Sequence, residues 1–134
     1  MIISDILKQI KTIAVVGLSD KPERPSWKVA DYLKKQGYRI IPVNPNISVW
    51  QGEKAYSTIR EIPKRIIVDA VDIFRKSEEA LFPVQDAVKR EVKLIWLQEG
   101  IINEEARQYA EKYNIPFIMN ACMMKAHRKI TPLT

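Results

Sequence analysis

Two short apolar runs, separated by a segment of helical periodicity, dominate the first third of the chain. The first run, residues 12–18, is rich in β-branched residues, as in a buried parallel strand, and it stops at the turn Gly17-Leu18-Ser19. Apolar side chains then recur at helical spacing from Pro25 to Gly37, and the second run, residues 38–43, predicts another strand. This stretch is therefore a βαβ unit. Its right-handed crossover brings the turns after both strands together, at the carboxyl ends where open α/β sheets bind ligands.

The same alternation of strands and helices continues to the end of the chain. A helix beginning near Ser4 precedes the βαβ unit, residues 47–56 predict an irregular loop, and residues 57–62 predict a short turn of helix. Three more strands are expected at residues 65–74, 93–97 and 115–119, alternating with helices at residues 77–90, 103–113 and 121–129. Ile66 and Ile67 are expected to be buried in the first of these three strands.

Five strands alternating with helices predict an α/β fold, in which a doubly wound parallel sheet carries helices on both faces. We expect the strand order 3-2-1-4-5, numbered along the chain, so that the topological switch point of the sheet lies between strands 1 and 4. That order would place the turn Gly17-Leu18-Ser19 opposite Gln98, Glu99 and Gly100. The end of the third strand, Phe74-Arg75, would complete the same rim.

Length and composition indicate one globular unit. At 134 residues the chain is expected to form a single domain, residues 1–134, that is long enough to bury a full core. No apolar run approaches the roughly 18 residues that span a membrane, and Asp5, Lys8 and Lys11 interrupt the first apolar residues, which argues against a secretory signal. A single cysteine, Cys122, allows no internal disulfide. We therefore expect a cytoplasmic protein without a membrane segment.

The excess of basic residues indicates the kind of partner. The 22 Lys and Arg against 16 Asp and Glu give a net charge of +6, which favours an anionic ligand. The basic side chains are scattered along helix faces apart from Lys125, Arg128 and Lys129, and no aromatic-rich strand offers a platform for stacked bases. The charge therefore favours an anionic partner without identifying it, and the scattered basic residues make nucleic acid the less favoured candidate.

The loop after the first strand departs from the dinucleotide-binding motif GxGxxG. Gly17 is followed by LSDKPERPS without a second or third glycine. The second strand ends in Asn44 and Pro45 rather than in the acidic residue that holds the adenosine ribose of NAD. Phosphates can still be bound by the free N–H groups of the helix start and by the polar side chains of Ser19, Lys21, Arg24, Ser26 and Lys28. The alternative is a plain strand-to-helix connection that binds nothing.

The sequence offers no catalytic constellation. Ser19 has no nearby His to act as a base, and His127 lacks a second His or Cys at metal-ligand spacing. The lone thiol of Cys122 fits a small buried hydrophobe better than a nucleophile. We therefore expect neither catalytic residues nor a metal site.

Four segments carry a resemblance to a known family, namely GLSDKPERPSWKVADYLKKQGYRIIPVNPN, VDIFRKSEE, KLIWLQEGI and NACMMKAH. From Thr12 to His127 the chain resembles the stand-alone CoA-binding domain proteins. These are similar to the Rossmann-like N-terminal domain of the succinyl-CoA synthetase α-subunit and of ADP-forming acyl-CoA synthetases. The GxS followed by RPS, the PVNP turn and the WLQ(x)GI segment of that family stand here in the expected order. Leu18 and Glu23 depart from the Ala and Gly that the family often has.

The resemblance implies that coenzyme A (CoA) binds across the carboxyl ends of the strands. By analogy, the residues that hold the pyrophosphate would be Gly17, Leu18, Ser19, Pro25 and Ser26. Those that line the adenosine side would be Val43, Asn44 and Pro45, and those that close over the nucleotide would be Phe74 and Arg75. A basic rim with Lys21, Arg24 and Arg75 suits the pyrophosphate and the 3′-phosphate of CoA. In the expected strand order Gln98 belongs to the same site.

The resemblance favours non-catalytic binding of CoA or an acyl-CoA. In the related synthetases the phosphorylated histidine and the ATP-handling parts lie in other domains, for which this chain has no room. Two alternatives stay open: an enzyme or enzyme subunit that acts on a CoA thioester, and a generic nucleotide-binding protein. The sequence also leaves open a partner subunit or a second copy of the chain.

Overall fold

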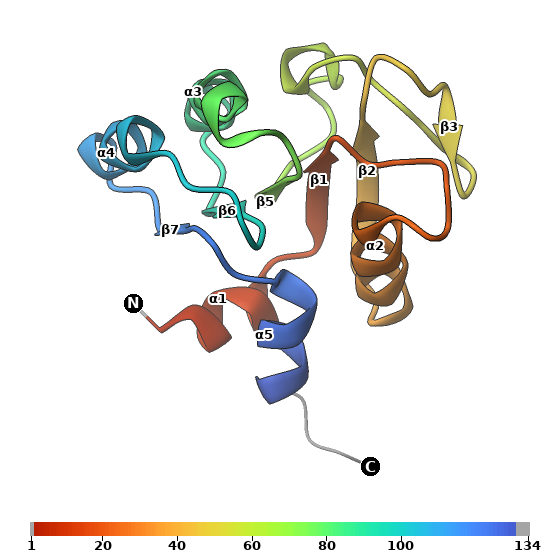
Figure 1. Ribbon diagram of the computed structural model, residues 1–134, viewed down its shortest axis with the longest axis horizontal. Helices are drawn as coiled ribbons and strands as arrows, with labels where there is room; N and C mark the ends of the chain where they lie inside the picture. The colour runs from red at the N-terminus through yellow and green to blue at the C-terminus, as the bar shows by residue number, and fades with distance from the viewer. Residues whose placement is uncertain (1, 131–134) are drawn as a thin grey trace.

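Five parallel strands form the central sheet of the computed structural model, which describes residues 2–130 (Figure 1). In spatial order the strands are β2 (Arg39–Val43), β1 (Thr12–Val16), β5 (Ala70–Ile73), β6 (Leu94–Leu97) and β7 (Phe117–Ile118). Each strand is parallel to its neighbours. Every residue of β5 and β6 is buried, as their apolar runs indicate. The expected α/β fold with a doubly wound, Rossmann-like parallel sheet is therefore confirmed.

The place of the third strand differs from the expected order 3-2-1-4-5. β5 lies between β1 and β6 rather than beyond β2, so that the five strands, numbered along the chain, have the order 2-1-3-4-5. The outer edge of β2 is already occupied, because Tyr56 donates its N–H to the Pro42 carbonyl at 3.0 Å and accepts from the N–H of Asn44 at 2.8 Å. The chain therefore crosses β1 before it forms β5. The topological switch point lies between β1 and β5, not between the first and fourth strands.

Helices cover both faces of this sheet (Figure 1). One face packs against α1 (Ile3–Gln9), α2 (Pro25–Lys35) and α5 (Met123–Ile130). The other packs against α3 (Leu81–Lys89), α4 (Glu104–Lys112) and the 3-10 turn η1 (Ile59–Glu61). No helix among residues 2–130 combines the length and the apolar character that a membrane crossing requires.

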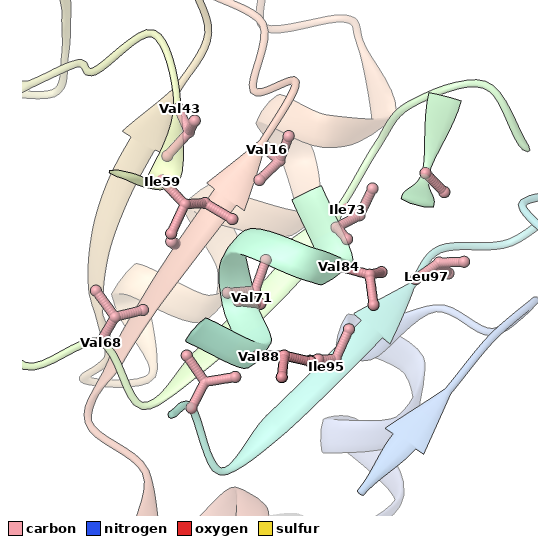
Figure 2. Close-up of a cluster of buried hydrophobic side chains, with 14 of the residues drawn as sticks. Val16, Val43, Ile59, Val68, Val71, Ile73, Val84, Val88, Ile95 and Leu97 are labelled. Atoms are coloured by element: carbon pink, nitrogen blue, oxygen red, sulfur yellow. The ribbon is translucent and has the colours of Figure 1, made fainter. Parts of the chain in front are cut away.

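Each face of the sheet has its own apolar core. Figure 2 shows Val84 and Val88 of α3 next to Val71 of β5 and Ile95 of β6, and these four side chains are buried in one cluster. Residues four apart on a helix share a face, so the apolar spacing in α3 turns this stripe toward the sheet. The opposite core joins α1, α2 and α5 to the sheet and includes Leu7, Leu33 and Met123.

The third strand is shorter than its apolar run indicates. It was expected at residues 65–74, but β5 begins only at Ala70, and Ile67 is 72% exposed rather than buried. Arg90 explains the difference, because its guanidinium donates four hydrogen bonds, to the carbonyl oxygens of Ile59, Ile62, Pro63 and Ile66. These bonds hold residues 59–66 in a curled segment beside the end of α3. The extended conformation can therefore begin only after that segment.

Two further segments differ from their expected form. The helix expected at residues 77–90 divides into the 3-10 turn η2 (Ser77–Glu79) and α3, which places Pro83 in the first turn of α3, where no intrahelical N–H is needed. Residues 47–56, expected to be irregular, contain an antiparallel hairpin of β3 (Val49–Trp50) and β4 (Glu53–Lys54). Its two-residue turn has φ of 45° at Gln51 and 82° at Gly52, as a type I′ turn requires.

One buried side chain in the sheet is polar and unpaired. Asp72 of β5 is fully buried, and neither carboxyl oxygen has a hydrogen-bond partner. Its neighbours in the sheet are Val15 of β1 and Trp96 of β6. Desolvation raises the pKa of the Asp72 carboxyl well above its ordinary range. Burial therefore favours the protonated, uncharged form of this carboxyl in the folded protein.

Candidate functional site

Three pockets lie around the carboxyl ends of β1, β2, β5 and β6, and neighbouring pockets share lining residues. The loop pocket, about 420 Å³, lies at the connection between β1 and α2. The α5 pocket, about 520 Å³, lies between the starts of α2 and α5, and it shares Pro25 and Phe74 with the loop pocket. The α3 pocket, about 300 Å³, lies between α3 and η1 and shares Arg75 with the α5 pocket. Together they surround the switch point of the sheet.

The loop pocket begins where β1 meets the ends of its two neighbours. Gly17 takes a φ of +85° and donates its N–H to the Val43 carbonyl at 2.8 Å. On the other side, the N–H of Phe74 donates to the Val16 carbonyl at 2.8 Å. Only glycine fits at position 17, because a Cβ there would overlap the backbone carbonyl of Phe74. The observed neighbour of the Gly17 turn is therefore Phe74, whereas the expected strand order placed Gln98 opposite it.

Two hydroxyl groups shape the chain between Gly17 and α2. The Ser26 hydroxyl is buried and accepts a hydrogen bond from the backbone N–H of Ser19 at 3.0 Å. The Ser19 hydroxyl accepts from the N–H of Lys21 at 3.1 Å. Both bonds curl the loop over the first turn of α2, so that the two hydroxyls have structural partners as well as a place in the pocket wall.

The first turn of α2 supplies free donors and positive charge. α2 starts with Pro25, and its N-cap residue, Arg24, makes no side-chain capping bond. The N–H groups of Ser26 and Trp27 lie in the first turn, where a helix has no carbonyls to accept them. Lys21 and Arg24 are exposed and line the same pocket, as does the acidic Asp20. Free N–H groups, a helix dipole and two cations make this turn suitable for an anion.

Asn44 joins the turns that follow β1 and β2. Its amide donates to the Leu18 carbonyl at 2.9 Å, and its side-chain oxygen accepts from the N–H of Asn46 at 2.9 Å. The Leu18 side chain itself is fully buried in the core, so only its backbone faces the loop. Pro45 is exposed. Leu18 and Pro45 line none of the three pockets.

The α5 pocket has a mainly apolar lining and charged side chains at its mouth. Val29, Phe74, Ile101 and Met124 contribute apolar surface. Cys122 also lines this pocket and is 7% exposed. The charged residues of the lining are Glu23, Lys28, Arg75, Glu99 and Lys125. Gln98 is buried, and its side-chain oxygen accepts from the N–H of Met123 at 3.0 Å, which fixes the start of α5 against β6.

The sequence predicted only two residues of the α3 pocket lining, Val43 and Arg75, as part of the site. The ends of β1 and β2, Val16 and Val43, form its apolar floor. Arg60 of η1 and Asp86 of α3 form an ion pair in its lining, with Arg60 Nε 3.4 Å from Asp86 Oδ1. Phe82 lines the pocket and is 75% exposed. The sequence shows that Phe82 and Asp86 are spaced to share one face of a helix. The ion pair of Asp86 with Arg60 of η1 depends on the fold and could not be predicted.

Most of the residues expected at the site therefore lie together. Those in the loop pocket are Gly17, Ser19, Lys21, Arg24, Pro25, Ser26, Asn44 and Phe74. Val43 and Arg75 line the α3 pocket, and Gln98 lines the α5 pocket. His127 lies elsewhere, in a pocket with Leu7 and Gly37 near the amino ends of β1 and β2. Its Nδ1 lies 2.8 Å from the Tyr32 hydroxyl, and burial lowers the pKa of its imidazole.

Several known proteins are similar to this chain. The Bacillus subtilis (strain 168) protein YneT is 41% identical over 125 residues, covering 93% of this chain and 91% of YneT. A structure of a Thermus thermophilus protein superposes with a TM-score of 0.90 at 32% identity, covering 96% of each chain. Subunit alpha of the ADP-forming acetate-CoA ligase II of Pyrococcus furiosus is 28% identical over 88% of this chain, which spans only 28% of that subunit. The model of the CoA binding domain matches residues 11–128. The chain therefore belongs to the CoA binding domain family.

Proposed function

We propose that this protein binds CoA or an acyl-CoA without catalysing a reaction on it. The observation that carries the proposal is the loop pocket at the start of α2, where free N–H groups, Lys21 and Arg24 meet. The larger α5 pocket adjoins it on one side, and the smaller α3 pocket begins at the neighbouring ends of β1 and β2. A ligand with phosphates at its centre and an extended group on each side matches this arrangement. CoA has that form, with an adenosine 3′-phosphate at one end of its pyrophosphate and a pantetheine arm at the other.

The pyrophosphate is assigned to the loop pocket. Its oxygens would accept from the N–H groups of Ser26 and Trp27 in the first turn of α2. They would also pair with Lys21 and Arg24, which line the pocket. Charge-assisted hydrogen bonds of this kind are roughly twice as strong as neutral ones. The Gly17 turn forms part of the wall of this pocket, and only glycine there lets the Phe74 backbone pack this close to the end of β1.

The two ends of CoA are assigned to the flanking pockets. The adenosine would occupy the α3 pocket, whose floor contains Val43, a residue expected on the adenosine side. The pantetheine arm would leave the phosphates past Phe74 and enter the mainly apolar α5 pocket, with Gln98 at its base. Arg75 borders both flanking pockets and is available to the 3′-phosphate.

NAD fits the same rim less well. The turn after β2 presents Asn44, whose amide and side-chain oxygen are both engaged within the protein, in place of a carboxylate for the ribose hydroxyls. The net charge of +6 favours the more heavily charged CoA. The family and the ligase subunit similar to this chain support the same choice. The proposal includes a cytoplasmic location, because a lone, largely buried cysteine fits a reducing compartment. It also includes a partner subunit or a second copy of the chain.

A thermal-unfolding panel tests this function. A ligand at one hundred times its dissociation constant adds about 2.7 kcal/mol of stability, so CoA and acetyl-CoA should raise the melting temperature, whereas NAD, ADP and an oligonucleotide at equal concentration should raise it less. Replacing Lys21 and Arg24 with Gln should reduce the rise in melting temperature that CoA causes. Replacing Arg107 with Gln is the matched control, since Arg107 pairs with Glu104 and Glu111 on α4. Equal shifts from CoA and NAD would contradict the proposal.

A further inference from the structure

The α3 pocket contains a carboxylate that phosphate binding does not explain. Asp86 lines the pocket, and only 11% of its side chain is exposed. A carboxylate beside a phosphate would repel it, so the pocket is not built around a phosphate alone. A mostly buried carboxylate at a pocket wall is suited to a ligand group that donates a hydrogen bond.

One oxygen of this carboxylate is available to a ligand. The ion pair engages Oδ1, which lies 3.4 Å from Arg60 Nε, and among residues 2–130 Oδ2 has no hydrogen-bond partner within the protein. Oδ2 is also not among the buried polar atoms that lack a partner, so it is open to solvent or ligand. Arg60 balances the charge of the carboxylate, which reduces its repulsion of an anionic ligand nearby.

An aromatic ring stands on the same face of α3. Phe82 and Asp86 are four residues apart in the helix and therefore lie one above the other. Phe82 is 75% exposed although it lines a pocket, so packing within this chain does not account for its position. A ring face of this kind can stack on a nucleobase, and such stacking is independent of which base is bound.

The walls of the pocket are fixed before any ligand arrives. Arg90, the C-cap residue of α3, holds the carbonyls around η1 through four hydrogen bonds. η1 is closed at its start by a capping box between Thr58 and Glu61. The distance between Asp86 and η1 is therefore set by the fold, as a site that discriminates between similar ligands requires.

We propose that Asp86 selects the adenine base of the ligand, with its Oδ2 accepting a hydrogen bond from the exocyclic amino group of a base stacked on Phe82. Adenine carries a donor at this position, whereas guanine carries an acceptor oxygen there, as does hypoxanthine. An acceptor oxygen opposite Asp86 would leave two acceptors facing each other. The inference rests on the proposed binding of CoA, and it assigns the chemical basis of base selection to one carboxylate.

The test compares CoA with its hypoxanthine analogue, in which the amino group is replaced by oxygen. Calorimetric titration of the unaltered protein should show binding of CoA at least about tenfold tighter than the analogue, since hydrogen bonds to charged groups contribute about 1.5–3 kcal/mol. In the variant Asp86→Asn, the side-chain amide can donate to the oxygen of the analogue. The preference for CoA should then fall below about threefold or reverse.

Asp31→Asn is the matched control, because Asp31 also forms an ion pair, with Lys35 at 3.0 Å, and lines none of the three pockets. It should keep the full preference. Equal affinity of the unaltered protein for both ligands would overturn the assignment of Asp86 while leaving CoA binding intact. An Asp86→Asn variant with the original preference, or with equal losses for both ligands, would overturn it as well. Failure to bind CoA at all would overturn the proposed function together with this inference.

Discussion

Gly17 and Phe74 come so close that the backbone carbonyl of Phe74, directly after β5, fills the space where a side chain at position 17 would stand. A Cβ on Gly17 would lie 3.1 Å from the carbonyl carbon of Phe74 and closer still to its oxygen. The φ of Gly17, +85°, also disfavours any L side chain. This contact joins the turn after β1 to the end of β5, and so it fixes the centre of the candidate site.

Replacing Gly17 with Ala should therefore destabilise the protein strongly. Backbone strain and overpacking against a rigid carbonyl together predict a loss of about 2–4 kcal/mol in the free energy of unfolding. Gly100→Ala is a close control, because Gly100 has a similar φ of +84° but nothing within 4 Å of its added Cβ. Urea unfolding should show a loss of only about 1 kcal/mol for this control. An equal loss of unfolding free energy in the Gly17→Ala and Gly100→Ala variants would mean that Phe74 does not crowd Gly17.

The two serines of the loop pocket should behave differently. Ser26→Ala removes the buried hydroxyl that accepts a hydrogen bond from the N–H of Ser19. This should lower the free energy of unfolding by about 1–2 kcal/mol even without ligand. Ser19→Ala removes only an exposed bond to the N–H of Lys21 and should change stability by less than about 0.5 kcal/mol. Thermal unfolding of the ligand-free variants measures both effects. A Ser26→Ala variant as stable as the unaltered protein would indicate that its hydroxyl serves the ligand alone.

Asp72 should make stability depend on pH. Because burial raises the pKa of its carboxyl in the folded protein, the folded state retains a proton that the unfolded state loses above about pH 4. Stability attributable to this group is therefore present at low pH and falls as pH rises, by about 1.4 kcal/mol per pH unit up to the folded pKa. Asp72→Asn lacks this dependence, so the stability of the variant relative to the unaltered protein should increase from pH 4.5 to pH 7. A difference that is constant with pH, measured by urea unfolding, would contradict the burial of an unpaired carboxyl.

Phe82→Ala should affect the ligand but not the fold. The side chain is 75% exposed, so the melting temperature without ligand should stay nearly unchanged. Loss of base stacking should weaken CoA by about 1–3 kcal/mol, or roughly 5- to 150-fold. Phosphopantetheine, which lacks the base, should bind the variant and the unaltered protein with equal affinity. Tyr113→Ala, at the C-cap of α4, is the control, since this ring is also exposed (49%) and lines none of the three pockets.

Sequence patterns predicted the parts of the site that are local in the chain. Residues 17–26 form one turn and one helix start, so Ser19, Arg24 and Ser26 could be placed in one loop without knowledge of the sheet, and they line one pocket. Phosphate binding at this loop stays a prediction. The position of β5 could not be read in this way, because it depends on Tyr56 occupying the outer edge of β2. An apolar run reports that a segment can be buried, but not which edge of the sheet is free to receive it.

The missed features share the same cause. Arg60 and Asp86 are 26 positions apart, and their ion pair exists only because Arg90 holds η1 beside α3. Ile67 fits a buried strand by its residue type, yet the same curled segment leaves it exposed. Asp72 interrupts an otherwise apolar strand, and its full burial is a tertiary effect that opposes its usual exposure.

The central claim is that CoA binds across the three pockets with its pyrophosphate at the start of α2. Isothermal titration calorimetry of CoA into the unaltered protein and into a variant with Lys21 and Arg24 replaced by Gln tests it most directly. We predict saturable binding of one CoA per chain, affinity reduced at least about tenfold in the variant, and binding of NAD that is much weaker than that of CoA. Absence of CoA binding, or equal affinity of both proteins for CoA, would contradict the claim.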